Sequence, residues 1–304
     1  MEYRLNNGVL ELTADTKGAE ILSVKRDGTE YIWHGDPAYW GRRTPILFPF
    51  VGQVRDGVYR HNGAEYHMGQ HGFARDQAFE LLSKSDDAIS FVLRENEQTL
   101  AVYPFRFELE VTYTLTGDSV TVGWRVRNPG QEKLYFSIGG HPAFCCPLHA
   151  GETWETYQID LRKNGAPLKQ ITVRPIERGG NVGASRKDIP LKDGCLTPTR
   201  ELFLGDALIL EDSQCDEVSL VNPEGKPYVT VSFDTPLVGL WSPAGKDAPF
   251  ICIEPWCGRT DSVDFTGELS ERAYGNVLAP GEEFCRAYTV RFMTGGQTPC
   301  HEKE

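Results

Sequence analysis

Residues 107–126, FELEVTYTLTGDSVTVGWRV, alternate between apolar and polar side chains with a period of two. Up to Leu115 the apolar residues occupy odd positions, and after Gly117-Asp118 they occupy even positions from Val120 to Val126. Such alternation is typical of a strand that buries one face, and a Gly-Asp dipeptide favours a tight reversal of the chain. The stretch therefore predicts an antiparallel β-hairpin.

The same pattern of strand-like segments and tight turns extends over the rest of the chain. Further turn dipeptides that tolerate positive φ are Asn7-Gly8, Asp27-Gly28, Asp56-Gly57 and Asn62-Gly63. Later strands are expected at Tyr228–Phe233, Leu237–Trp241, Phe250–Glu254 and Phe284–Phe292. Amphipathic helical periodicity is nearly absent, and so is the βαβ pattern of a parallel nucleotide-binding sheet. We expect an all-β, mostly antiparallel fold with large packed sheets.

The chain has no linker that would divide it. No Gly/Ser-rich or Pro-rich segment interrupts the strand pattern, and Arg178–Pro198 is expected to be a long surface loop rather than a boundary. The length of 304 residues is compatible with one large β domain. Residues 1–304 are therefore predicted to form a single domain.

Composition and charge indicate what kind of ligand the protein binds and in which compartment it is found. With 40% hydrophobic and 24% charged residues, the chain is an ordinary folded protein. Its formal net charge of -12 repels nucleic acid and anionic membranes, so a neutral or small ligand is favoured. The start lacks a signal-peptide pattern, apolar runs are shorter than a membrane span, and the 8 cysteines lack regular spacing. We expect reduced thiols and a cytoplasmic protein.

Three segments break the strand pattern by concentrating Gly, Pro, His and charged residues. They are QHGFAR at Gln70–Arg75, SIGGHPAF at Ser137–Phe144 and IEPW at Ile253–Trp256. A rigid β scaffold commonly presents functional side chains in such places, although a lone His there more often satisfies backbone groups. Glu254 ends an apolar run, where an ionised carboxylate needs partners; its alternative role is a structural ion pair with an arginine.

Taken together, these segments resemble the aldose 1-epimerase (mutarotase) family, and most closely its LacX-like branch. Matching blocks follow the family's order along nearly the whole chain: RRTPILFPFVGQVRDGVY, YHMGQHGFARDQAFEL, YPFRFELEVTYTL, YFSIGGHPAFCCPL, LFLGDALIL and ICIEPWCGRTD. The resemblance implies a galactose mutarotase-like β-supersandwich that binds a pyranose in a polar cleft. It also implies that no metal or other cofactor is needed.

The resemblance assigns a role to each matching residue. His141 matches the general acid that protonates the ring oxygen, and Glu254 matches the general base that takes the proton from the anomeric hydroxyl. The open aldehyde then rotates and recloses with the roles reversed, which gives the other anomer. His71 and Arg43 match positions that hydrogen-bond the sugar near its reacting end, and Asp206 matches a carboxylate that binds ring hydroxyls.

The chemistry of the two residue types agrees with this assignment. A histidine has an ordinary pKa of about 6.5 and can supply a proton near neutral pH, where carboxylates are normally ionised. A strand-end glutamate kept ionised by hydrogen bonds, or by a cation such as Arg43, suits the base. Among the aromatic residues Trp40, Phe73, Trp241 and Trp256, most are expected in the core or cleft wall, and Trp241 is chosen as the one that packs against a sugar face.

Several alternatives stay open at this point. A metal cluster of His61, His67 and His71 is disfavoured by the intervening Asn62-Gly63 turn. A non-catalytic sugar-binding or regulatory protein is the main alternative function, and glycoside hydrolysis is disfavoured because it normally uses two carboxylates. The substrate is expected to be a free hexose or a sugar phosphate, with the acidic net charge favouring an uncharged sugar; the oligomeric state is open.

Overall fold

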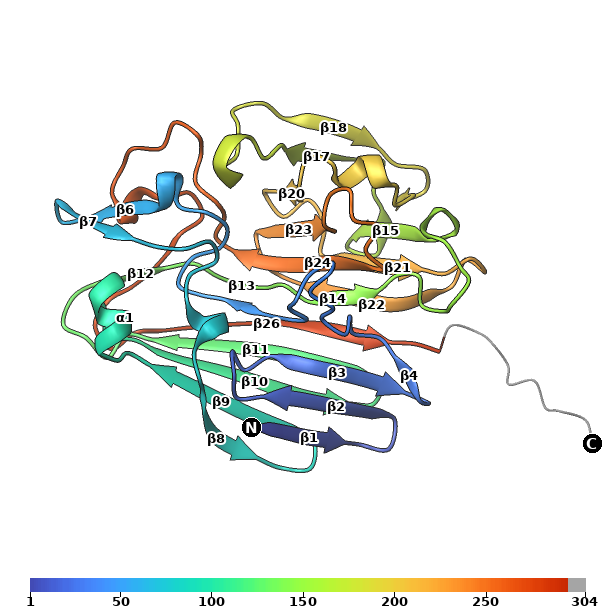
Figure 1. Ribbon diagram of the computed structural model, residues 1–304, viewed down its shortest axis with the longest axis horizontal. Helices are drawn as coiled ribbons and strands as arrows, with labels where there is room; N and C mark the ends of the chain where they lie inside the picture. The colour runs from blue at the N-terminus through green and yellow to red at the C-terminus, as the bar shows by residue number, and fades with distance from the viewer. Residues whose placement is uncertain (295–304) are drawn as a thin grey trace, which may run out of the picture.

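The computed structural model describes residues 1–294 and consists almost entirely of antiparallel β-sheet (Figure 1). Two large sheets of ten and eight strands dominate the described chain. Side chains from both sheets, such as Val111 of the first and Ile253 of the second, belong to one hydrophobic core. The predicted all-β, antiparallel fold is confirmed.

The ten-stranded sheet is built around the predicted hairpin. Strands β10 (Glu108–Thr116) and β11 (Ser119–Arg127) pair with Thr116 opposite Ser119, and the apolar side chain of every second residue is buried. The hairpin lies between β26 (Glu283–Phe292) and β9 (Ala88–Arg94). The sheet also contains β16 (Ala166–Pro167), β15 (Gln158–Lys163), β19 (Cys195–Leu196), β21 (Glu217–Val221), β22 (Pro227–Phe233) and β8 (Glu80–Lys84). The alternation of residues 107–126 thus shapes the centre of this sheet.

The eight-stranded sheet has β24 (Phe250–Cys257) near its middle, buried along its whole length. The other strands are β18 (Lys187–Pro190), β17 (Gln170–Arg174), β20 (Leu208–Leu210), β23 (Leu237–Trp241), β13 (Ile138–Gly140), β14 (Ala143–Cys145) and β5 (Ile46–Leu47). Because successive side chains of a strand point to opposite faces, Ile251 and Ile253 enter the main core, whereas Cys252 and Glu254 point to the other face.

Smaller elements flank the two sheets. They are the four-stranded sheet β1 (Glu2–Asn6), β2 (Leu10–Asp15), β3 (Ile21–Arg26) and β4 (Thr29–Glu30), the pairs β6 (Val58–His61) with β7 (Ala64–His67) and β12 (Leu134–Phe136) with β25 (Asn276–Leu278), and helix α1 (Glu97–Val102). Asn96 caps α1 by accepting a hydrogen bond from the Thr99 N–H. Within residues 1–294, no helix has both the length and the apolar character needed to cross a membrane.

One expectation of the sequence analysis is wrong. The segment Arg178–Pro198 is not simply a loop, because it contributes β18 and β19, one to each large sheet. Lys187–Pro190 lies at a sheet edge and has mostly exposed side chains. Such an edge strand buries neither face, so it lacks the apolar alternation by which a strand is recognised in sequence.

Candidate active site

A cleft of about 700 Å³ opens on the face of the eight-stranded sheet to which Glu254 points. His141, which directly follows β13, and Glu254 of β24 both line it. The two strands approach closely because Gly139 faces Trp256, and a Cβ at Gly139 would lie 2.5 Å from the indole Cδ1. A Cβ at Gly239 on the other neighbouring strand would lie 2.5 Å from the Cη2 of the same ring. The glycine of the SIGGHPAF segment therefore makes room for the wall of the cleft.

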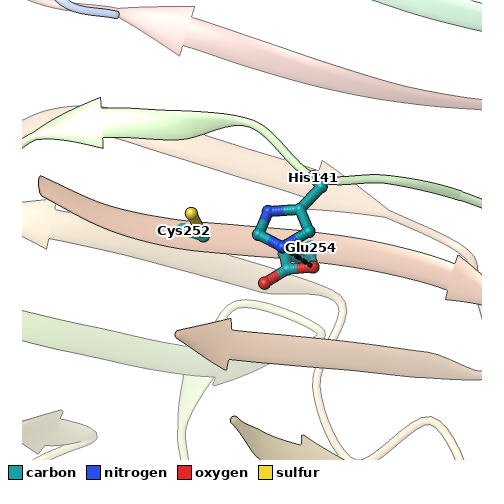
Figure 2. Close-up of side chains that lie close together, drawn as sticks. All are labelled: His141, Cys252 and Glu254. Carbon is teal, nitrogen blue, oxygen red and sulfur yellow. Dashed lines mark ion pairs between the residues drawn. The ribbon is translucent and has the colours of Figure 1, made fainter. Parts of the chain in front are cut away.

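His141 and Glu254 meet at the base of the cleft. Their Nε2 and Oε2 atoms are 3.3 Å apart, and the side chains are 8% and 1% exposed (Figure 2). Among the described residues, no arginine forms an ion pair with Glu254. Arg43, which was expected to hold this carboxylate, instead donates from Nη1 to the Leu22 carbonyl at 2.8 Å and does not line the cleft.

Burial shifts the pKa of both members of this pair. Burial, and then the positive charge of Arg75, lowers the pKa of His141 to about 3. Burial, and then the negative charge of Asp206, raises the pKa of Glu254 well above its ordinary value. Both shifts favour a neutral imidazole and a protonated carboxyl group. This distribution of the proton is the reverse of the one expected from the sequence, where the histidine carries it.

His71 lies beside this pair and is held in one orientation. Its ring centroid is 5.6 Å from that of His141, and its Nδ1 accepts a hydrogen bond of 3.1 Å from the Gly52 N–H. Burial lowers the pKa of His71 well below 6.5, so the ring is neutral. With Nδ1 occupied as the acceptor, Nε2–H is left as the donor of the ring. His71 lines the cleft.

Aromatic rings enclose His141 from two sides. Trp40 stacks on the imidazole with centroids 4.7 Å apart and planes at 27°, and Trp241 meets its edge at 5.4 Å and 86°. Both indoles line the cleft, as does Trp256, whereas Phe73 packs against the main core. Trp241, the aromatic residue chosen from the sequence, therefore lies where it can contact a ligand.

Asp206 and several unpredicted side chains complete the lining. Asp206 has a φ of 76° and accepts a hydrogen bond of 2.8 Å on Oδ1 from the Ala207 N–H. Lys246, which sequence reasoning did not single out, also lines the cleft and donates from Nζ to the Tyr39 carbonyl at 3.0 Å. Lys246 belongs to a short loop after β23 without a distinctive motif, so the sequence carried no signal for it. Gln70 and Arg75 line the cleft too, and both belong to the QHGFAR segment.

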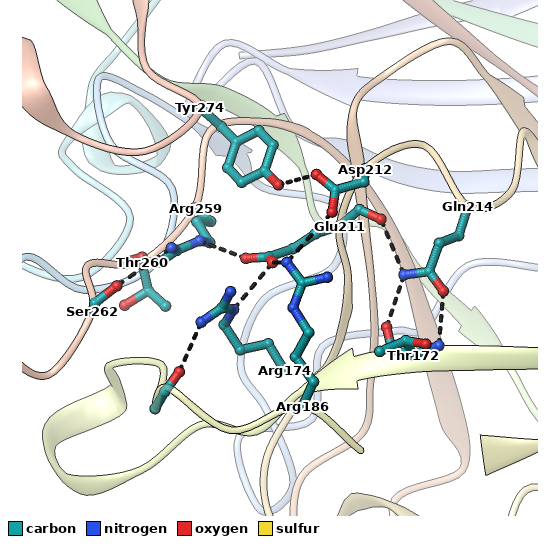
Figure 3. A network of polar contacts seen from close by, with 11 residues as sticks. Thr172, Arg174, Arg186, Glu211, Asp212, Gln214, Arg259, Thr260, Ser262 and Tyr274 are labelled. Carbon is teal, nitrogen blue, oxygen red and sulfur yellow. Dashed lines mark hydrogen bonds and ion pairs between the residues drawn. The ribbon is translucent and has the colours of Figure 1, made fainter. Parts of the chain in front are cut away.

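A network of ion pairs supports one wall of the cleft (Figure 3). Glu211, 4% exposed, pairs with Arg259 Nε at 2.7 Å and Arg174 Nε at 3.1 Å. Arg259 also donates to the carbonyl of Thr260, whose hydroxyl donates to the Gly180 carbonyl at 2.7 Å. Thr260 and Gly180 line the cleft. The network thus fixes cleft backbone without itself entering the lining.

His61, His67 and His71 do not form a metal-ligating cluster among the described residues. His61 packs against the rings of Phe105 and Tyr135, and only His71 of that set lines the cleft. Within residues 1–294, the group that brings metal-ligating atoms together is His141, Cys252 and Glu254, whose candidate ligand atoms all lie within 4.8 Å of one another.

Comparison with known proteins identifies the family. The family model "Aldose 1-epimerase" matches residues 1–290. The chain is 31% identical to the chromosomal protein LacX of Lactococcus lactis subsp. lactis over 301 residues, which cover 96% of this chain and 100% of LacX. A solved galactose mutarotase related enzyme from Lactobacillus acidophilus is 35% identical, with a TM-score of 0.91 over 97% of this chain and 98% of that chain.

A second solved structure agrees with the first. The galactose mutarotase-like protein from Lactobacillus casei ATCC 334 is 31% identical, with a TM-score of 0.90 over 96% of this chain and 100% of that chain. The galactose mutarotase-like fold and the family resemblance expected from the sequence are confirmed by these matches. The chain belongs to the aldose 1-epimerase family.

Proposed function

We propose that the protein is an aldose 1-epimerase that interconverts the α and β anomers of an aldose in this cleft. The observation that carries the proposal is the buried pair of His141 and Glu254, whose Nε2 and Oε2 atoms are 3.3 Å apart. Among the described residues, no arginine forms an ion pair with the carboxylate of Glu254. Titratable groups whose environments push their pKa values apart are characteristic of acid/base catalysis. Membership of the aldose 1-epimerase family supports the same reaction.

The pair works with one shared proton. One member gives this proton to the ring oxygen of the sugar while the other takes the proton of the anomeric hydroxyl, and the bond between the anomeric carbon and the ring oxygen breaks. After rotation of the aldehyde, the same transfers run in reverse on the other face. The pair therefore holds one proton before and after each turnover, and no co-reactant is consumed.

The pKa shifts indicate where that proton rests. With His141 neutral and Glu254 protonated, the pair is in the form that follows ring opening when His141 acts first as the acid. Before it can open a cyclic sugar, the pair must move its proton from Glu254 to His141, across 3.3 Å. The open-chain aldehyde needs no such transfer. We therefore propose that the resting protein is already set for ring closure.

Other side chains of the cleft hold the sugar. The neutral His71 offers Nε2–H as a donor, Asp206 offers an acceptor, and Trp241 offers an apolar face. Arg75 lines the cleft where Arg43 does not, so we propose that Arg75 takes the donor role that the resemblance assigned to Arg43. Holding the sugar in this way converts the acid/base step into an intramolecular one.

Anomer equilibration tests the proposal directly. Freshly dissolved pure anomers of hexoses, pentoses and their 6-phosphates are followed by polarimetry or NMR against the spontaneous rate. We expect acceleration for at least one sugar with an unchanged final ratio of anomers. Failure across the panel would overturn the proposal, and sugar binding without acceleration would favour a non-catalytic sugar-binding protein.

A further inference from the structure

Three side chains with metal-ligating atoms lie close together, and two of them, His141 and Glu254, line the cleft. Cys252 and Glu254 are two residues apart on β24 and point to the same face, while His141 reaches them from the end of β13 (Figure 2). Their candidate ligand atoms all lie within 4.8 Å of one another, and all three residues are buried. The acid/base reaction uses only two of them, so it leaves the thiol unexplained.

Two polar atoms of this group lack hydrogen-bond partners within the described chain. They are Oε2 of Glu254, whose near neighbour is Nε2 of His141 at 3.3 Å in ion-pair geometry, and Nδ1 of His141; both atoms are buried. Buried polar atoms are normally hydrogen-bonded, so two buried donor or acceptor atoms without hydrogen bonds indicate that this group can take a further ligand. This observation is independent of the clustering of the three residues.

The types of the three side chains indicate which cation would bind. A thiolate, an imidazole and a carboxylate are the ligands that Zn²⁺ takes in proteins, at about 2.0–2.3 Å in a tetrahedron. Ligand atoms in such a tetrahedron lie about 3.5 Å apart. The three atoms need to approach one another only modestly from separations of up to 4.8 Å. Because His141 and Glu254 line the cleft, a cation can reach these two ligands from it.

We propose that His141, Cys252 and Glu254 form a binding site for a borderline divalent cation such as Zn²⁺, and that this cation competes with the sugar. Binding displaces the proton of the Cys252 thiol, and any proton on Glu254, to solvent. The cation occupies the very groups that move protons in the proposed reaction, so it acts as a reversible inhibitor. The inhibition rests on the proposed function, whereas the binding does not.

Charges around the site favour some cations over others. Asp206 lies close enough to act on Glu254, and the chain's formal net charge is -12, so the field attracts cations. Arg75 and Lys246 line the same cleft and oppose them. A hard cation such as Mg²⁺ gains little from a thiol and prefers oxygen ligands, so we expect it to bind poorly.

Titration with Co²⁺ tests the binding without reference to activity. Co²⁺ takes the place of Zn²⁺ and reports a thiolate ligand by a sulfur-to-cobalt charge-transfer band. We expect this band in the wild-type protein and its loss in Cys252→Ser, with binding weakened at least about tenfold. Cys257→Ser is the matched control, because Cys257 is buried on the same strand but belongs to the main core.

Contrary results are equally clear. A spectrum without the charge-transfer band, or a band that survives in Cys252→Ser, would overturn the site. If Cys252→Ser does not fold, as judged by its thermal melt, Cys252→Ala serves in its place. Mg²⁺ should leave the Co²⁺ spectrum unchanged, and displacement of Co²⁺ by equimolar Mg²⁺ would contradict a thiolate site.

Inhibition is measured separately on the anomer equilibration rate. Zn²⁺ should slow the wild-type and Cys257→Ser proteins, EDTA should restore the rate, and Cys252→Ser should need at least about tenfold more Zn²⁺. Equal sensitivity of the Cys252 and Cys257 variants would overturn the proposal. If no sugar is turned over, the proposed function fails, and the Co²⁺ spectrum still decides the metal site.

Discussion

Two buried glutamates of this protein sit in opposite electrostatic surroundings. Glu211 follows β20 and is 4% exposed, with guanidinium groups of Arg259, Arg174 and Arg186 within 2.7, 3.1 and 3.4 Å (Figure 3). Glu254 is 1% exposed on β24, and its partner in the ion-pair geometry is the imidazole of His141 at 3.3 Å. Strands β20 and β24 both pair with β23, so one sheet carries both carboxylates.

The two surroundings suit two different roles, a structural one for Glu211 and an acid/base one for Glu254. A buried carboxylate surrounded by guanidinium groups is compensated by them and can hold backbone in place, as Glu211 does through Arg259 and Thr260. A buried carboxylate without such compensation has a raised pKa and can exchange a proton, as we propose for Glu254. The type of partner, rather than burial alone, distinguishes the two roles.

The largest expected effect is on turnover at the uncompensated site. Glu254→Gln and His141→Asn should each lower the rate of anomer equilibration by about 10²–10⁴-fold, because each removes one end of the proton transfer. The measurement is the rate of equilibration of a pure anomer at neutral pH. Near-wild-type turnover in either variant would show that the residue is not part of the acid/base pair.

The control is that both variants stay folded. For Glu254→Gln, the raised pKa of Glu254 also predicts the sign of the change in stability. A carboxyl group whose pKa is raised by folding stabilises the protein below its unfolded pKa, and this stabilisation is lost as the pH rises through the folded pKa. The neutral amide of Glu254→Gln avoids that loss. Its melting temperature at pH 7–8 should therefore equal or exceed that of the wild type.

The compensated site should respond mainly in stability. Glu211→Gln leaves the buried Arg259 and the partly buried Arg174 without their counter-charge, and breaking a buried pair typically costs about 3–5 kcal/mol. Denaturant unfolding measures this loss, and turnover per folded molecule should fall far less than in Glu254→Gln. A loss of stability below about 1 kcal/mol would show that the network does not support the cleft wall in the way proposed.

The pH dependence of stability sharpens the comparison further. Folding lowers the pKa of His141 from 6.5 to about 3, so the unfolded chain binds a proton between these values that the folded chain does not. This group's contribution is present above pH 6.5 and is lost as the pH falls, by up to about 1.4 kcal/mol per unit. The free energy of unfolding of the wild type should fall relative to His141→Asn between pH 7 and 4.5. A pH-independent difference would contradict the burial of a neutral imidazole.

The smallest expected effect is a difference in KM between substitutions of Arg75 and Arg43. Arg75→Gln should raise KM by about tenfold, since charge-assisted hydrogen bonds contribute about 1.5–3 kcal/mol. Arg43→Gln is the matched control, because Arg43 donates to the Leu22 carbonyl away from the cleft. Its KM should stay within about twofold of the wild type. The reverse order of the two effects would restore the role that the family resemblance gave to Arg43.

The sequence by itself determined the all-β class and the positions of the main strands. The alternation of residues 107–126 became β10 and β11, and the apolar run from Phe250 became β24. Alternation is a local property, since each residue's face follows from its neighbours, so it can be read directly. The same locality explains why the exposed edge strand β18 was missed.

Only the tertiary structure decided which side chains share the cleft and in which direction their pKa values shift. Arg43 and Arg75 look equally suitable in the sequence, and only the packing places Arg75 in the lining. The raised pKa of Glu254 depends on burial by many segments and on the charge of Asp206, which is remote in the sequence. Cys252 beneath His141 likewise follows from the pairing of β24 with its neighbours. Desolvation and charge act through space, and no local pattern in the chain encodes them.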